Sequence, residues 1–183
     1  MIILASASPR RRELLSLVVD EFIVVPSGAD ESTNIIDAPE RVRHLAQRKA
    51  RYIAKDYSDD IILGADTVVE LNGEIFEKPQ DTADAERMIR ALSGNTHTVH
   101  TGICVIQGDT EIVQNCATRV AFALMTDEEI NQYIQTENVT DKAGAYAIQS
   151  GAAKFITGID GDFFNVVGLP VQMLYQILLQ LPK

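Results

Sequence analysis

The chain has few of the residues that bind metals through sulfur or imidazole. It has two cysteines, Cys104 and Cys116, and their positions do not match the spacing of a metal site. Its three histidines lack cysteine or histidine partners at such spacings, so the sequence offers no zinc site. Because both cysteines lie in apolar stretches, we expect them to be buried thiols of a cytoplasmic protein.

The chain also lacks long apolar runs and an excess of basic residues. No stretch approaches the roughly 18 apolar residues of a membrane helix, and the N-terminal apolar run is too short for a signal peptide. The formal net charge of −10 argues against a nucleic-acid backbone as partner. The absence of Gly-x-Ser-x-Gly and of a Walker-type Gly-Lys-Ser/Thr motif disfavours a serine hydrolase and a P-loop enzyme.

What is present indicates one ordinary globular domain over residues 1–183. Hydrophobic residues make up 46% and charged residues 23%, so disorder is not expected. Short apolar runs alternate with helical patterns, which predicts an α/β fold: an elongated mixed sheet with flanking helices and a central cleft. Among the strands we expect one over 61–63 that ends at residues 64–67, after which 68–71 continues extended. Pro39 opens a long helix whose many basic residues we expect to form mostly a solvated face, although any one of them could reach a cleft.

The N-terminal segment predicts an anion site. Residues 2–5 form a short apolar strand, Ser8 is a helix N-cap, and Pro9 occupies the first helical position. Arg10 and Arg11 then fall in the first turn, where the helix dipole is positive and a cation is unfavourable without a facing anion. Phosphate is the natural anion for such a site. The alternative is that the arginines form a solvated charge run.

A second prediction comes from the dipeptide Asn72-Gly73, which is a strong signal for a two-residue hairpin. With the turn centred there, the register places Thr67 opposite Lys78 and Asp66 within one residue of Lys78. Glu31, in an acidic loop over 27–37, is a candidate second carboxylate. Each of these residues has an ordinary alternative: Asp66 as a turn residue, Lys78 as a surface lysine and Glu31 as a solvated loop acid.

Together these residues predict metal-assisted phosphate chemistry on a small anionic substrate. The arginines and Lys78 supply cations for phosphate charge. Asp66 and Glu31 supply carboxylates, and magnesium or manganese binds through one or two carboxylates plus phosphate oxygens.

The sequence resembles the Maf proteins, nucleoside triphosphate pyrophosphatases whose name refers to septum formation. The matching segments run in order over nearly the whole chain: Leu4-Ala5-Ser6-Ala7-Ser8-Pro9-Arg10-Arg11, Gly64-Ala65-Asp66-Thr67-Val68-Val69, Lys78-Pro79, Leu92-Ser93-Gly94, Thr101-Gly102, Asp141-Lys142-Ala143-Gly144-Ala145-Tyr146 with Ile148-Gln149, and Ile159-Asp160-Gly161-Asp162.

The resemblance implies an inosine-triphosphatase-like fold, often dimeric, and hydrolysis of the α–β phosphoanhydride with a divalent metal, Mg²⁺ or Mn²⁺. It implies that Asp66 accepts the proton, that Glu31 binds the metal together with Asp66, and that Glu31 and Lys78 join Asp66 in the catalytic set. The implied substrate-binding residues are Ser6, Arg10, Arg11, Lys49, Thr67 and Gln149.

Within that family, Ala65-Asp66-Thr67 and Gln149 resemble the branch acting on dTTP and UTP, and modified pyrimidine nucleotides fall within the same expectation. Gln149 carries both a donor and an acceptor, which suits the edge of uracil or thymine. Two alternatives stay open. A non-catalytic nucleotide-binding regulator of cell division predicts binding without product, and a phosphatase predicts a diphosphate and orthophosphate.

Overall fold

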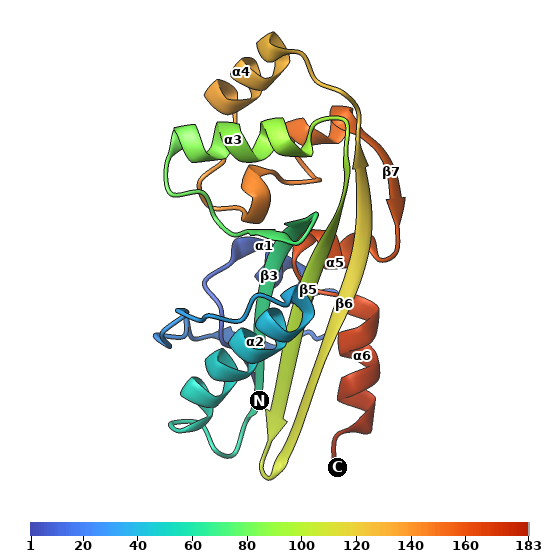
Figure 1. The fold of residues 1–183 in the computed structure, drawn as a ribbon. Coiled ribbons are helices and arrows are strands. Elements are labelled where there is room, and N and C mark those ends of the chain that lie inside the picture. The colour runs from blue at the N-terminus through green and yellow to red at the C-terminus, as the bar shows by residue number, and fades with distance from the viewer. Residues whose placement is uncertain (183) are drawn as a thin grey trace.

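The protein, described by a computed structural model over residues 1–182, is built on one elongated seven-stranded sheet (Figure 1). The strand order is β2-β1-β3-β5-β6-β7, and β4 also pairs with β3. Strand β1 runs parallel to β2 and β3, and the other pairs are antiparallel, so the sheet is mixed as predicted. The strands are β1 (Ile2–Leu4), β2 (Phe22–Val24), β3 (Ile61–Leu71), β4 (Glu74–Phe76), β5 (Thr96–Gln107), β6 (Thr110–Phe122) and β7 (Ile156–Asp160).

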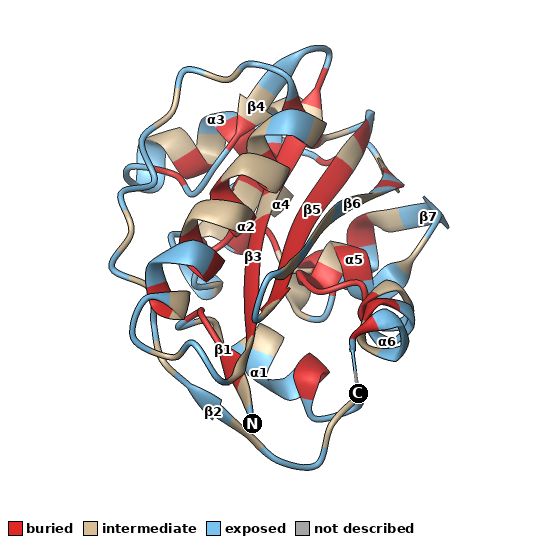
Figure 2. Ribbon diagram, turned by 90° about the horizontal axis from the view of Figure 1, so that it is seen from below, coloured by how far each residue is buried: buried red, intermediate tan, exposed pale blue. Residues whose placement is uncertain are grey.

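Helices cover both faces of the sheet. They are α1 (Pro9–Leu15), α2 (Ala38–Ala54), α3 (Thr82–Leu92), α4 (Asp127–Thr136), α5 (Phe163–Val167) and α6 (Val171–Gln180). Side chains alternate between the faces of a strand, so Ile62 packs in the smaller core under α2 and Leu63 in the larger core on the other face. The middle of β3 and β5 is therefore buried on both sides (Figure 2).

One edge of β3 is interrupted. Strand β1 pairs with residues 61–63 and β4 with residues 69–71, while β5 occupies the opposite edge over residues 62–70. Within the described chain, residues 64–68 therefore have no strand partner on the first edge. Because β1 ends at Leu4 and the chain turns into α1, a space opens beside this part of β3.

Strand β3 is longer than the sequence predicted. We expected a strand over 61–63 that ends at residues 64–67 before an extended segment over 68–71, and this break is wrong, because one strand runs from Ile61 to Leu71. Gly64 is needed inside the strand because α2 lies directly on it: a Cβ there would come within 2.2 Å of the Ala46 carbonyl oxygen. Gly102, on β5, has the same relation to Val42, also at 2.2 Å. The glycine marks a close approach of two backbones.

Several local predictions are confirmed. The side chain of Ser8 accepts a hydrogen bond from the Arg11 amide at 3.4 Å, with Pro9 at the start of α1. The hairpin pairs Leu71 with Glu74, although β4 ends at Phe76, before Lys78. Cys104 is buried, but Cys116 is only half-buried, so the prediction of a buried thiol holds for Cys104 alone; both thiols are free. No helix among residues 1–182 is long and apolar enough to cross a membrane.

Candidate active site

A cavity of about 320 Å³ lies beside the interrupted edge of β3, beyond the end of β1. All nine residues singled out from the sequence line it: Ser6, Arg10, Arg11, Glu31, Lys49, Asp66, Thr67, Lys78 and Gln149. Asp141, Lys142 and Tyr146 also line it, and the sequence had given them no individual role. The signal that pointed there was the run of small residues after Asp141.

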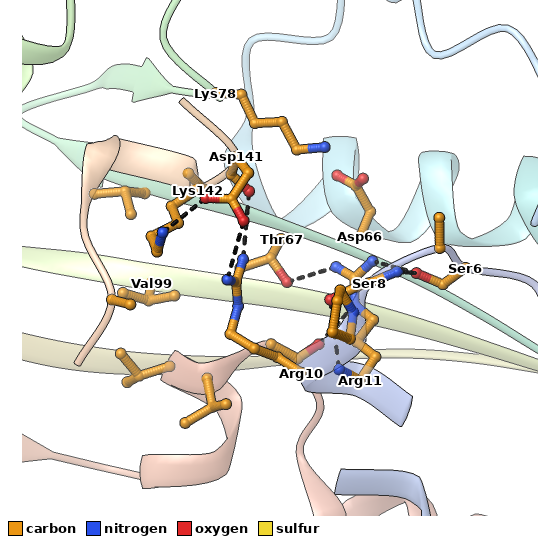
Figure 3. A pocket seen from close by; sticks show the side chains of 18 of the residues that line it. Ser6, Ser8, Arg10, Arg11, Asp66, Thr67, Lys78, Val99, Asp141 and Lys142 are labelled. Carbon is orange, nitrogen blue, oxygen red and sulfur yellow. Dashed lines mark hydrogen bonds and ion pairs between the residues drawn. The ribbon is translucent and has the colours of Figure 1, made fainter. Parts of the chain in front are cut away.

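The first wall of the cavity is the N-terminus of α1. Arg10 turns toward Asp141, which it contacts through the carboxylate at 3.5 Å and the main-chain carbonyl at 3.3 Å (Figure 3). Asp141 also pairs with Lys142 at 2.7 Å. An aspartate on a distant segment thus supplies the negative charge that arginines in the first turn of a helix need.

Arg11 points inward from the same turn. Its guanidinium donates to Ser6 Oγ at 3.2 Å and to Thr67 Oγ1 at 2.9 Å. Burial lowers the pKa of Arg11, while the nearby charges of Asp66 and Glu31 raise it. Because an arginine stays ionised in proteins, a positive charge is held at the inner end of the cavity.

The second wall carries two carboxylates that share one ammonium group. Lys49 Nζ lies 2.7 Å from Asp66 Oδ1 and 2.7 Å from Glu31 Oε2. The Asp66 side chain is 11% exposed, whereas the Glu31 side chain is 58% exposed. Burial raises the pKa of Asp66, and the charges of Lys49 and Arg11 oppose that rise. A buried carboxylate beside cations is a suitable proton acceptor.

The burial of Lys49 could not be predicted from the helical periodicity alone. The helical pattern predicts a mostly solvated basic face on α2 and does not say which residue could reach a cleft, yet Lys49 is only 8% exposed. The glycines of β3 and β5 let α2 lie close to the sheet. The Lys49 side chain is therefore largely shielded from solvent, and its ammonium group reaches the carboxylate of Asp66. The resemblance, and not the helical pattern, had identified it.

The loop that carries Glu31 is tied to α2 by two arginines. Arg48 donates to the carbonyl of Ser32 at 2.8 Å and pairs with Asp30 at 3.2 Å. Arg41 donates to the carbonyls of Thr33 and Ile35 at 3.2 and 3.0 Å.

Arg41 also reaches the other side of the cavity. Its Nε donates to Glu77 Oε1 at 3.1 Å, next to Lys78. Lys78 is exposed, and it and Asp66 point toward each other across the cavity (Figure 3). The hairpin register that predicted this proximity is confirmed as far as Phe76, but Lys78 itself follows the strand.

The third wall is the segment over 141–149. The hydroxyl group of Tyr146 hydrogen-bonds to His97 Nε2 at 2.7 Å, and both rings pack edge-on against Phe122. Burial lowers the pKa of His97 to about 4, so the imidazole is neutral near pH 7. This buried contact fixes the segment on β5 and leaves Gln149 exposed at the cavity.

The donors present can hold a divalent cation only together with a ligand. No group of three or more His, Cys, Asp or Glu side chains gathers at one point within residues 1–182. Glu31 and Asp66 are nevertheless brought together around one ammonium group. Two carboxylates plus phosphate oxygens form a donor set that magnesium or manganese accepts, so these residues fit such an ion.

Comparisons with known proteins identify the family and the fold. A family profile described as Maf-like protein matches residues 1–181. A "dTTP/UTP pyrophosphatase" of Koribacter versatilis is 48% identical, covering 97% of this chain and 92% of the relative. One of Thermococcus kodakarensis with the same name is 42% identical, covering 97% and 95%. The Staphylococcus aureus Ham1 structure superposes with a TM-score of 0.56 at 13% identity, covering 97% of both chains, which shows the predicted inosine-triphosphatase-like fold.

Proposed function

The chain belongs to the Maf-like protein family, and we propose that it hydrolyses dTTP and UTP to the nucleoside monophosphate and pyrophosphate. Relatives that are 42–48% identical over nearly their full length carry that activity as their name. The observation that carries the proposal is the cluster of Asp66, Lys49 and Glu31 facing Arg10 and Arg11 in one cavity. Phosphoryl transfer needs this combination of cations and carboxylates.

In the proposed reaction Arg10, Arg11, Ser6 and Lys78 bind the phosphates. In the free protein the Arg10 guanidinium contacts the Asp141 carboxylate. A bound triphosphate would replace that carboxylate as the partner of the guanidinium. Two arginines suit this task because their planar guanidinium groups match phosphate oxygens in pairs. Lys78, which is exposed, contributes a point charge.

Asp66 accepts the proton in the chemical step. A water oxygen bonds to the α-phosphorus, the bond from that phosphorus to the bridging oxygen breaks, and pyrophosphate leaves. The water proton passes to the Asp66 carboxylate, whose pKa burial raises in the free protein. Lys49 orients the carboxylate by its hydrogen bond at 2.7 Å.

Glu31 and Asp66 would hold the divalent metal, magnesium or manganese, together with the substrate. When bound, the ion supplies positive charge against the phosphate oxygens of the transition state. Lys49 keeps the two carboxylates side by side in the free protein. Because the Glu31 side chain is exposed on a loop, its carboxylate has room to move from Lys49 to the metal ion.

Gln149 reads the base in this proposal. Its amide presents both a donor and an acceptor to the edge of uracil or thymine, and modified pyrimidines keep much of that edge. Tyr146 and His97 fix the segment from which Gln149 projects.

One experiment tests the function. The protein is incubated with a panel of purine and pyrimidine nucleoside triphosphates and magnesium or manganese, and the products are separated by chromatography. We expect monophosphate and pyrophosphate, fastest from dTTP and UTP. Binding without product would instead indicate a nucleotide-responsive regulator of division, and diphosphate with orthophosphate would indicate a phosphatase.

Three further proposals concern the molecule as a whole. Length and composition support a single domain over residues 1–183, and the free cysteines support a cytoplasmic location. The resemblance supports a homodimer in solution. Light scattering after size exclusion measures the mass, and a monomer at micromolar concentration would contradict the dimer.

A further inference from the structure

A buried hydrogen-bond chain lies behind Arg11. The guanidinium donates through Nε to the Gly168 carbonyl at 2.9 Å, through Nη1 to Ser6 at 3.2 Å and through Nη2 to Thr67 at 2.9 Å. A guanidinium has five N–H bonds. Three are therefore committed to protein acceptors, and one on each terminal nitrogen is left for a ligand in the cavity.

This series of hydrogen bonds continues from Thr67 into the protein interior. Thr67 Oγ1 lies 2.9 Å from Thr101 Oγ1, and the Thr101 hydroxyl donates to the Asn165 carbonyl at 3.0 Å. Thr101 is fully buried and does not line the cavity.

The direction of this chain is fixed by counting protons. Arginine has no acceptor, so Thr67 must accept from it, and a carbonyl has no proton, so Thr101 must donate to Asn165. Each hydroxyl has one proton. The contact between the two threonines therefore forms with Thr67 as donor and Thr101 as acceptor. All the contacts are satisfied together in this order only.

The inner end of this hydrogen-bond series is buried and hydrogen-bonded to two strands. Asn165 is fully buried, and its side-chain amide donates to the Val99 carbonyl at 3.0 Å and to Thr118 Oγ1 at 2.9 Å. Thr118 in turn donates to the Asp162 carbonyl at 3.0 Å. These contacts fix α5 on β5 and β6, so the carbonyls of Asn165 and Gly168 are held in place around Arg11.

We propose that Thr101 is a positioning residue for phosphate binding: through Thr67 it sets the rotation of the Arg11 guanidinium. This rests on the proposed function of the cavity. It also changes the role expected of Thr67. Because the single proton of Thr67 is committed to Thr101 and phosphates at neutral pH mainly accept hydrogen bonds, Thr67 orients Arg11 and does not itself bind the triphosphate.

The test replaces the hydroxyl of Thr101 without changing its volume. Thr101→Val leaves Thr67 without its acceptor and releases the guanidinium. We expect the KM for dTTP and the Kd for pyrophosphate, the latter measured by calorimetry, to rise about tenfold, as loss of one network hydrogen bond implies. The kcat should change much less. Thr101→Ser keeps the hydroxyl and should restore both constants.

Two controls separate positioning from structural damage. Thr98→Val changes a half-buried threonine on the same strand, for which the described residues offer no side-chain hydrogen bond, and should leave both constants unchanged. In an Arg11→Ala background, Thr101→Val should have no further effect on pyrophosphate affinity, because the group that it positions is gone. A loss of the same size in both backgrounds would overturn the proposal.

The remaining outcomes are also decisive. Thr101→Val with wild-type affinity for pyrophosphate would overturn the proposal. If that variant fails to fold, Thr67→Val, which changes a half-buried residue at the cavity, should give the same tenfold loss, and unchanged affinity there overturns it. Failure of the wild-type protein to release pyrophosphate from dTTP would refute the proposed function. The calorimetric comparison would still judge the role of Thr101.

Discussion

The two carboxylates that contact Lys49 are held by very different parts of the molecule. Asp66 lies in the middle of β3, opposite Gly102 on β5, and its side chain is 11% exposed. Glu31 lies in a loop without regular structure, and its side chain is 58% exposed. Main-chain hydrogen bonds of the sheet fix the first position, and a few contacts from arginine side chains fix the second.

This difference indicates where the cavity is rigid. A strand residue cannot move without breaking the sheet register, whereas exposed ion pairs are each worth only about 0–1 kcal/mol. We therefore expect substitutions on the sheet side to reduce the chemical step strongly. Those on the loop side should have smaller effects that an excess of metal or substrate offsets.

The largest effect is expected at Asp66. Asp66→Asn removes the proton acceptor and should lower kcat about a thousandfold, within the usual range for a general base. Steady-state release of pyrophosphate from dTTP measures it. The matched control is Glu70→Gln on the same strand, outside the cavity, which should keep nearly full activity. Activity close to wild type in Asp66→Asn would remove Asp66 from its proposed role.

The next largest effect is expected at His97, whose buried contact with Tyr146 fixes the segment over 141–149 on the sheet. The pKa of His97 is lowered by burial from 6.5 to about 4 in the folded protein. The unfolded chain then binds more protons between these values, so folding stability falls as pH drops from 6.5 to 4. The loss from this residue should reach about 3 kcal/mol.

His97→Gln isolates this contribution. The variant should lack that part of the acid destabilisation, while other groups titrate equally in both proteins. Urea unfolding at pH 7, 6, 5 and 4 gives the difference in unfolding free energy. Parallel curves for wild type and variant would show that His97 does not anchor Tyr146 in a neutral, buried state.

A smaller effect is expected on the loop side. Glu31→Gln removes one carboxylate from the proposed metal set and should lower activity roughly tenfold at low magnesium, about 1.4 kcal/mol. Raising the magnesium concentration should recover much of the loss. The measurement is activity as a function of magnesium, and Asp30→Asn, whose ion pair with Arg48 lies on the same loop, is the comparison. A loss that no concentration of metal offsets would place Glu31 with Asp66.

The smallest effect is expected at Arg41, which ties the loop to the segment before Lys78. Arg41→Ala should raise the KM roughly threefold with little change in kcat, since it loosens two loops without touching β3. Arg51→Ala, which breaks an ion pair with Glu111 away from the cavity, is the control. Equal KM values in the two variants would mean that Arg41 does not order the site.

The sequence predicted the parts of the site that depend on local structure. Ser8 and Pro9 identify the start of α1, and Asn72-Gly73 fixes the hairpin register. Both are short-range signals whose physical basis lies within a few residues. The α/β class was predictable because the apolar periodicity of each strand and helix is also local.

The remaining features depend on packing between distant segments. Gly64 reads as the end of a strand until α2 is placed against it, and Lys49 reads as a surface residue until that helix is seated. The partnership of Arg10 with Asp141 joins segments 131 positions apart. No local pattern encodes such pairs, so only the folded chain shows them.

The seat of α2 on Gly64 and Gly102 has a consequence for protein engineering. Any side chain at either glycine would push the helix away from the sheet and carry Lys49 out of reach of Asp66. A designer who wishes to alter substrate preference should therefore keep α2, β3 and β5 unchanged and diversify the segment around Gln149. A library restricted in this way would vary recognition while retaining the catalytic geometry.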